Sequence, residues 1–229
     1  MNHVKTLIHV HTNYSFDSDI SPKALASFAD REDIGCIAVT DHDTIEGAKH
    51  LAAISPANVI VGSEITTRDG HLIGLFLKEN ISAGLSARDT AEAIKQQGGL
   101  VFLPHPFVLA FGCGLGKMSW EIADLVDAVE VNNAQNLSAR ADRLAKQFAA
   151  KLNLPSFVGA DSHMQTSIAP CYQLMRPSAG PADFLAALNS ATLVPGFHPL
   201  SYFLSTGLRV ARHLLGFSLP TPFGLHAAA

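Results

Sequence analysis

The sequence predicts an α/β barrel, and three observations predict it. Short apolar runs alternate with helix-like stretches along most of the 229 residues. The runs are apolar almost without interruption, which is typical of parallel strands buried on both faces. Polar residues gather at or near the carboxyl ends of these runs, where α/β barrels carry their active sites. We therefore expect parallel strands with helices outside them, closed into a barrel rather than spread as an open sheet.

Seven apolar runs are the predicted strands. They are rich in valine, isoleucine and leucine, and most of them end at polar or turn-forming residues. In chain order they are "TLIHVHT" (6–12), "GCIAVTDHD" (35–43), "NVIVGSEIT" (58–66), "HLIGLFL" (71–77), "LVFLPHP" (100–106), "AVEVNN" (128–133) and "SFVGADSH" (156–163).

Four of the segments between or after these runs carry helix start signals. Ser21 is an N-cap followed by a proline at the first helical position, and Ser86 is an N-cap for a helix that stops at a glycine pair. Ser138 and Pro181 open two later helices. The predicted helices cover residues 22–33, 87–97, 139–153 and 181–190.

Composition and charge exclude several classes of protein. A hydrophobic content of 48% can fill the core of one large domain of this length, so a disordered chain is not expected. The net charge is −4 and the basic residues are scattered, so the sequence shows no surface for long nucleic acid. A small anionic substrate is compatible with this charge.

The cysteines and the hydropathy pattern predict a cytoplasmic protein. The three cysteines are far apart and show no C-x-x-C spacing, so neither a disulfide framework nor a thiolate zinc site is expected. The first histidine pair comes too early for a secretory signal peptide. Pro104 and Pro106 interrupt the apolar stretch at 100–112, so we expect no membrane span and no membrane partner.

The first predicted strand carries two histidines one residue apart. Residues i and i+2 of a strand point to the same face, so we expect His9 and His11 to project together. Ile8 and Val10 are then expected to pack on the opposite face. Two imidazoles on one face can chelate a metal ion. Taken alone, however, such a pair is better explained by a strand face that meets water.

Polar residues at five further strand ends change this interpretation. Each alone is an ordinary turn, cap or loop residue, except Glu130, which is costly to bury in an apolar strand without a partner. Together, six strand ends deliver histidines and carboxylates that would repel one another or stay unsatisfied without cations. Because no cysteine is among them, the set suits Mn²⁺, Fe²⁺ or Zn²⁺ with open positions for water and substrate. The five further ends supply Asp41, His42, Glu64, His105, Glu130, Asp161 and His163.

Five motifs occur in an order that resembles a known family. The sequence resembles the PHP (polymerase and histidinol phosphatase) family of metal-dependent phosphoesterases over residues 7 to about 165. As a set, the motifs are far more specific than any one of them. They are H-x-H-T-x-Y-S-x-D-S (9–18), T-D-H-D-T (40–44), G-x-E (62–64), H-P (105–106) and D-x-H (161–163).

The resemblance implies a distorted seven-stranded β/α barrel with two or three divalent ions at the carboxyl ends of its strands. The first ion would be held by His9, His11, Glu64 and Asp161. Glu64 would bridge to a second ion, which would also be held by His105 and Glu130. A third ion would be held by Asp17, His42 and His163. His71 is a weaker candidate, because a polar residue at a strand start explains it at least as well.

The resemblance also implies a reaction, the hydrolysis of a phosphoester by water that the metal ions activate. Glu64 would be essential as the shared ligand, and His42, with Asp41 nearby, could stabilise or protonate the departing alkoxide. Asp41 is expected to support a metal-bound histidine from behind. Arg140 is a candidate contact for the substrate phosphate, although ordinary surface charge explains it better.

Three functions stay open at this point. The leading one is a phosphatase for a small phosphomonoester or a nucleotide, and the second is an exonuclease or phosphodiesterase for short oligonucleotides. The family contains members of both kinds, and the resemblance does not separate them. The third is a metal-stabilised binding domain without catalysis. The expected open coordination positions argue against the third function, because a structural metal site has no use for them.

The domain division follows the last motif. Residues 1–196 are predicted to form the barrel domain, and residues 197–229 a helical tail that packs on the barrel or forms a homo-oligomer contact. An interfacial membrane helix is less favoured, because Arg209 and Arg212 alone attract lipid weakly. His198 precedes a proline but belongs to no motif, so it is left out of the predicted site.

Overall fold

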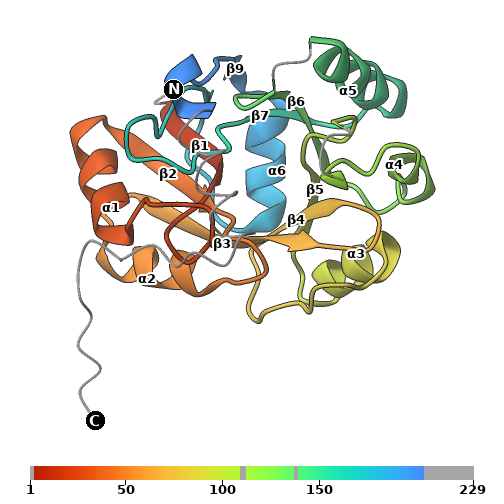
Figure 1. Cartoon of the computed structure of the whole chain (residues 1–229), viewed down its shortest axis with the longest axis horizontal. Coiled ribbons are helices and arrows are strands. Elements are labelled where there is room, and N and C mark those ends of the chain that lie inside the picture. The colour runs from red at the N-terminus through yellow and green to blue at the C-terminus, as the bar shows by residue number, and fades with distance from the viewer. Residues whose placement is uncertain (1–2, 109–111, 137–138, 204–229) are drawn as a thin grey trace.

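Within the described residues, nine strands form a single mixed sheet in the computed structural model (Figure 1). The structure describes residues 3–108, 112–136 and 139–203. The strands lie in the order β7-β6-β5-β4-β3-β2-β1-β8-β9. They are β1 (Val4–Val10), β2 (Ile34–Val39), β3 (Asn58–Thr66), β4 (His71–Leu75), β5 (Leu100–Leu103), β6 (Ala128–Asn133), β7 (Ser156–Gly159), β8 (Tyr172–Met175) and β9 (Thr192–Val194).

The sheet curls until its two arms nearly meet at β1. The first half of β1 pairs with β8, whereas its second half faces the segment that follows β7. The amide of Ala160 donates to the carbonyl of Ile8 at 2.9 Å, and the amide of His11 donates to the carbonyl of Ser162 at 3.0 Å. The predicted α/β barrel is thus confirmed in a nearly closed form. All seven predicted segments contain a strand, and β8 and β9 add an antiparallel pair.

Strand β4 runs against its neighbours, contrary to the expectation of parallel strands. It is antiparallel to both β3 and β5. Only residues 67–70 connect β3 to β4, a length that permits a hairpin but not a crossover helix. The first residue of β4, His71, therefore pairs with Thr66 and lies at the same mouth of the barrel as the carboxyl end of β3.

Four of the helices match the predicted ones. Ser21 and Ser86 accept hydrogen bonds from backbone amides, as expected of N-caps, whereas the expected start at Ser138 lies outside the described residues. α2 and α4 were not predicted, because Ile45 gives α2 no side-chain cap and α4 has only 4 residues. The helices are α1 (Pro22–Arg31), α2 (Glu46–Ile54), α3 (Ala87–Gln96), α4 (Met118–Glu121), α5 (Ala139–Leu152) and α6 (Pro181–Asn189).

The apolar core has an inner and an outer part. In the inner part, side chains of the strands such as Ile8, Phe102 and Phe157 pack together with Phe184 of α6. Figure 1 shows α6 between the two arms of the sheet. The outer part joins the other faces of the strands to α1, α2, α3 and α5. Burial of apolar area on both sides of the sheet stabilises the frame on which the polar mouth is built.

A bulge in β1 decides where its histidines point. His9 has a φ of +67°, and the register of β1 with β2 shifts between Ile8 and Val10. Ile8 belongs to the inner core, while Val10 belongs to the outer core together with Leu25 of α1. The expectation that Ile8 and Val10 share a face is therefore wrong, because the extra residue at the bulge interrupts the alternation of faces.

Only the first part of the predicted tail falls within the described residues. Tyr202 is buried against the barrel, whereas Phe197 and Leu200 are exposed. Residues 204–229 lie outside the described part of the chain, so an oligomer contact through the tail stays a prediction. In the part that the structure describes, no helix has both the length and the apolar character needed to cross a bilayer.

Candidate metal centre

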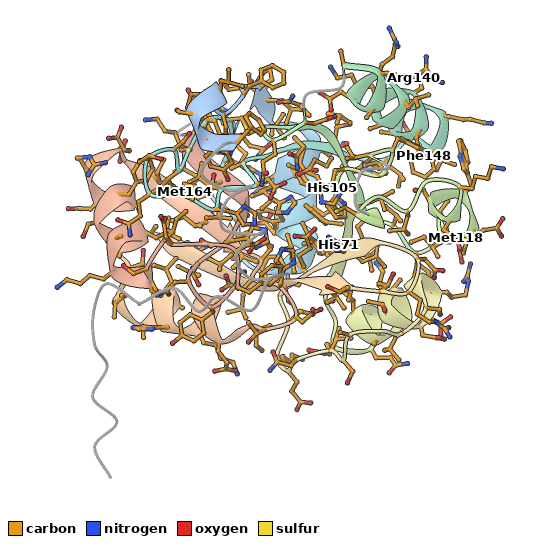
Figure 2. All side chains as sticks on the ribbon, in the orientation of Figure 1. His71, His105, Met118, Arg140, Phe148 and Met164 are labelled. Atoms are coloured by element: carbon orange, nitrogen blue, oxygen red, sulfur yellow. The ribbon has the colours of Figure 1, made fainter. Side chains whose placement is uncertain are left out.

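The side chains proposed as metal ligands meet at the mouth formed by the carboxyl ends of the parallel strands. They come from β1, β3 and β6 and from the segments that follow β1, β2, β5 and β7. His71, at the start of the reversed strand β4, joins them. Figure 2 places His71 and His105 close together near the centre of the molecule. Their nitrogen and oxygen atoms form four overlapping sets of possible metal donors, and Glu64 belongs to two of them. Together with the contacts of Asp17 and Glu64, these atoms make up three neighbouring donor groups.

The first donor group joins β1, β3 and the segment after β7. It consists of Nε2 of His9, Nε2 of His11, Oε2 of Glu64 and Oδ1 of Asp161. Nε2 of His9 lies 3.1 Å from the Glu64 oxygen and 3.5 Å from the Asp161 oxygen. Nε2 of His11 lies 3.2 Å and 3.6 Å from the same two atoms. Ligands held at about 2.0–2.2 Å from one ion stand about 2.8–3.6 Å apart, so this group has the size of one ion's ligand shell.

His11 is held in the protonation state of a metal ligand. Its Nδ1 donates to Oγ of Ser15 at 3.1 Å, and Ser15 donates onward to Oδ1 of Asp41 at 3.0 Å. The other nitrogen, Nε2, is buried and makes no hydrogen bond to any described residue. Its lone pair faces the carboxylate of Glu64, and only a cation or a proton between the two acceptors makes that contact favourable.

Asp41 was expected to bond a histidine directly, but Ser15 lies between Asp41 and His11. Its two oxygens accept from the amide and the hydroxyl of Thr12 at 2.6 and 2.8 Å, besides the bond from Ser15. A Cβ atom at Gly47 would lie 2.0 Å from Oδ2 of Asp41, so the glycine leaves the space that this carboxylate occupies. Asp41 therefore reaches His11 through Ser15 rather than by a direct bond.

Glu130 lies behind His9. Nδ1 of His9 donates to Oε1 of Glu130 at 2.9 Å, which directs Nε2 of His9 toward the first donor group. Oε2 of Glu130 accepts from the amide of His105 at 2.6 Å and from Nδ2 of Asn133 at 2.9 Å. A Cβ atom at Gly159 would lie 1.5 Å from Oε1, so this contact depends on the glycine. Both oxygens of Glu130 are thus engaged with protein donors, and its expected ligation of a second ion stays a prediction.

The second donor group is built on the other oxygen of Glu64. Nδ1 of His71 lies 2.8 Å from Oε1 of Glu64, and Nε2 of His105 lies 3.0 Å from the same oxygen. Glu64 is 1% exposed and lies between the two groups, with one oxygen in each. A carboxylate shared in this way is the arrangement expected of a bridge between two neighbouring ions.

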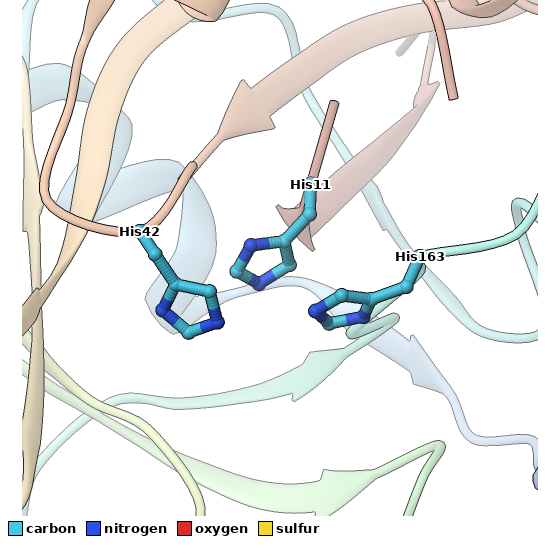
Figure 3. A group of neighbouring side chains, drawn as sticks. All are labelled: His11, His42 and His163. Carbon is cyan, nitrogen blue, oxygen red and sulfur yellow. The ribbon is translucent and has the colours of Figure 1, made fainter. Parts of the chain in front are cut away.

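The third donor group lies beside the first. Figure 3 shows the rings of His11, His42 and His163 turned toward a common space, and their nitrogens lie within 4.8 Å of one another. Oδ2 of Asp17 lies 3.4 Å from Nε2 of His42 and 3.3 Å from Nε2 of His163. Asp17, His42 and His163, which the sequence analysis grouped together, are therefore neighbours in the structure.

Burial and neighbouring charge act on the histidines in different proportions. Burial lowers the pKa of His11 to about 3, and the nearby ring of His163 adds to this effect. Burial also disfavours the charged form of His42, but the carboxylates of Glu64 and Asp17 outweigh it and raise the pKa of His42 to about 9. One histidine is thus neutral at pH 7 while another is protonated in the metal-free protein.

The carboxylates respond in the complementary sense. Burial alone would raise the pKa of Glu64, but His9, His71 and His42 hold that pKa well below its usual range. Burial is likewise outweighed at Asp161, whose pKa is lowered chiefly by His9. In the metal-free protein, protonated histidines supply the positive charge that these ionised carboxylates need. Divalent ions would replace those protons, and the imidazole and carboxylate donors fit Mn²⁺, Fe²⁺ or Zn²⁺.

The structure changes the sequence-based ranking of His71 but not that of Arg140. His71 was the weaker candidate, yet it contacts Glu64 directly. The four-residue connection before β4 was the signal that could have found it, because a hairpin returns the chain to the same mouth. Arg140 is exposed in the first turn of α5, and Figure 2 shows it apart from His71 and His105, so its contact with substrate stays a prediction.

The chain matches established protein families. A model of the PHP domain matches residues 8–151, and a model of PHP-associated sequences matches residues 139–193. Together these ranges contain every residue of the three donor groups. They end before His198 and Tyr202.

Individual proteins extend this similarity. An uncharacterized protein of Methanocaldococcus jannaschii is 38% identical over 155 residues, which are 62% of this chain and 89% of that protein. A two-domain protein of Bacteroides vulgatus containing a predicted PHP-like metal-dependent phosphoesterase has a TM-score of 0.68 at 18% identity, over 91% of this chain and 70% of that one. A lesion-specific endonuclease of Pyrococcus furiosus has a TM-score of 0.63 at 13% identity, over 84% of this chain and 58% of that one. Both structures share the fold of this chain.

Proposed function

The chain belongs to the PHP domain family, and from this premise we propose that it is a metal-dependent phosphoesterase that hydrolyses a small phosphomonoester or a nucleotide. The position of Glu64 carries the proposal. Its Oε2 lies 3.1 Å from His9 and its Oε1 lies 3.0 Å from His105, so one buried carboxylate serves two donor groups. Two-metal hydrolases hold their ions about 3.5–4 Å apart, a spacing that a carboxylate bridge of this kind provides.

The candidate metal ligands and the residues that hold them would have different roles in such a reaction. Divalent ions, when bound, would supply the charge that neutralises phosphoryl oxygens and the acidity that makes water a nucleophile near neutral pH. Glu64 would keep the two ions adjacent. His42, whose ring is 13% exposed at the mouth and whose pKa is raised to about 9, would donate a proton to the departing alkoxide when no third ion occupies its position.

Asp41 would act as a positioning residue. It holds the hydroxyl of Ser15, and Ser15 accepts both from Nδ1 of His11 and, at 3.0 Å, from the amide of His42. One hydroxyl thereby orders a ligand of the first donor group and the backbone of the third. Loss of the Asp41 carboxylate would release both, although Asp41 itself would not meet the substrate.

Two aromatic side chains favour a nucleotide among the small substrates. Tyr14 and Phe16 are 45% and 52% exposed, and the ring of Phe16 stacks on His42 with centroids 5.5 Å apart. Flat aromatic surfaces bind nucleobases by stacking, at about 1–3 kcal/mol per base. A base beside Phe16 would leave its phosphate close to the donor groups.

The second candidate is a nuclease for short oligonucleotides. The fold shared with the Pyrococcus furiosus endonuclease is compatible with it. The net charge of −4 argues against a long nucleic acid, because such polymers are bound largely through basic side chains. Arg140 is proposed as a peripheral phosphate contact in either case.

A side-by-side assay separates the candidates. Purified chain loaded with Mn²⁺ is given phosphomonoesters, nucleoside bisphosphates and short oligonucleotides, and kcat/KM is compared. We expect about two or three bound ions per chain and the highest kcat/KM for a monoester or bisphosphate. A clear preference for oligonucleotides would promote the nuclease. Fewer than one bound ion with no Mn²⁺-stimulated hydrolysis would leave a binding domain without catalysis.

A further inference from the structure

The turn that carries Asp161 and His163 is bound from behind by a segment outside both family matches. Asp161 belongs to the first donor group and His163 to the third, so this turn serves two groups. Asp161 has a φ of +46°, a region that L-residues rarely adopt, that costs about 1 kcal/mol or more and that persists only where surrounding contacts hold it. The turn therefore needs external support to present both side chains.

Tyr202 supplies that support through one hydroxyl. The hydroxyl accepts from the amide of His163 at 2.8 Å and donates to the carbonyl of Asp161 at 3.0 Å. It thus closes the turn by linking the backbone groups of the two ligand residues. Tyr202 is 1% exposed, so water does not compete for these bonds.

His198 holds Tyr202 and the residue before the turn. Its ring stacks on Tyr202 with centroids 3.7 Å apart and planes at 5°. Nε2 of His198 donates to the carbonyl of Ala160 at 2.8 Å, and Nδ1 accepts from the hydroxyl of Ser167 at the same distance. The amide of His198 donates to the carbonyl of Ala134, which anchors the segment to the barrel after β6.

We propose that Tyr202, held by His198, is a positioning residue that sets the Asp161–His163 turn for binding two neighbouring ions at once. The inference rests on the proposed metal-dependent function. It assigns a role to residues 198–202, which neither family model covers. Supports of this kind commonly change metal affinity by about 10–100-fold when removed.

The test is Mn²⁺ binding to the metal-stripped full chain, measured by titration calorimetry, with Tyr202→Phe as the variant. Phenylalanine keeps the stack on His198 and removes only the hydroxyl. We expect the Mn²⁺ dissociation constant to rise about 10-fold, with a circular dichroism spectrum like that of the wild type. Tyr172→Phe is the matched control. Tyr172 lies in β8, which pairs with the first half of β1, whereas the donor groups lie at the carboxyl end of β1. The Mn²⁺ affinity of this variant should equal that of the wild type.

A second pair of variants covers failure of Tyr202→Phe to fold. Both His198→Gln and His198→Leu lose the ring that stacks on Tyr202, but glutamine keeps a donor for the carbonyl of Ala160 and leucine does not. The leucine variant should therefore bind Mn²⁺ more weakly than the glutamine variant. Equal affinities of the wild type and Tyr202→Phe, or of the two His198 variants, would overturn this inference alone. A wild-type chain that binds no Mn²⁺ would overturn the proposed function and the inference with it.

Discussion

The first and second donor groups share Glu64 but differ in how their other members are supported. In the first group each ligand has a second hydrogen bond behind it: His9 to Glu130, His11 to Ser15, and Asp161 from Asn133 at 2.9 Å. Such bonds fix the tautomer and the direction of a ligand before the metal arrives. The first group is therefore preorganised for an ion.

Among the described residues, nothing gives the second group the same backing. Nδ1 of His105 is buried, yet it makes no hydrogen bond to any described residue, and the ring of His71 is 18% exposed. Both rings can turn at smaller cost than His9 or His11. From this difference we predict that the two groups bind ions with unequal strength. We expect a tightly held ion in the first group and an exchangeable ion in the second.

The largest effect should follow from removing what the groups share. Glu64→Gln keeps the size of the side chain and one acceptor oxygen, but it removes the charge that serves two ions. We expect turnover to be abolished, with a loss on the order of several kcal/mol in the transition state, or at least about 1,000-fold in kcat/KM. Steady-state kinetics at saturating Mn²⁺ measures this.

The fold of the Glu64→Gln variant should survive, because the apolar cores do not depend on this ligand. Glu46→Gln is the matched control, since Glu46 is half exposed and pairs with Lys49 on the surface of α2. It should have wild-type activity. Near wild-type activity in Glu64→Gln would contradict the bridging role and the two-ion arrangement together.

Two separate substitutions, one in each group, test whether the first and second donor groups bind ions with different strength. His71→Gln should raise the Mn²⁺ concentration for half-maximal activity by about 10–100-fold, with activity recovering at saturation, because only the exchangeable ion is weakened. His11→Gln should lose activity that added Mn²⁺ does not restore. Metal titrations of both variants check this. Equal loss and equal recovery would show that the two groups bind with similar strength.

The smallest effect concerns the pH dependence of the metal-free protein. The folded pKa of His42 is about 9, above its ordinary value of about 6.5, so its stabilising contribution is complete below pH 6.5 and is lost as pH rises toward 9. We expect the unfolding temperature without metal to fall over this window, by about 2–4 °C for each kcal/mol lost.

Metal should reverse that trend, because ions bind the neutral imidazoles and bind them better as pH rises. Thermal unfolding at pH 6.5 and 9, with chelator and with Mn²⁺, gives the comparison. The stabilisation by Mn²⁺ should grow between the two pH values. A metal-free unfolding temperature that rises with pH would show that the protonated histidines do not balance the buried carboxylates.

The sequence predicted the barrel and the meeting of the candidate ligand residues because both depend on strand order. Strands with polar carboxyl ends place those ends together whatever the details of packing. His9, His11 and Glu64 were found in this way. Individual directions were harder to predict, because the reversal of β4 that brings in His71 depends on how a short connection folds.

Contacts behind the ligands were not accessible to pattern reasoning. The bulge at His9 changes which neighbouring residues face inward. The pattern of polar and apolar residues in the strand does not indicate that a bulge is present. Glu130 sits behind His9 only because Gly159 leaves room, a fact of packing between neighbouring strands. His198 was set aside because it matched no motif, and its stack on Tyr202 joins segments that the sequence alone could not pair.

Because the sheet is only nearly closed, an ion bound at the mouth would also affect how firmly the barrel is held together. The seam of the barrel runs between β1 and the segment after β7, and the described hydrogen bonds across it include those at Ala160 and His11. His9 and Asp161 lie on opposite sides of this seam. An ion bound to both would link residues about 150 positions apart in the chain and, because it binds the folded form, would stabilise the closed seam. Loading the metal would then fasten the seam, and stripping it would leave the barrel free to open there first.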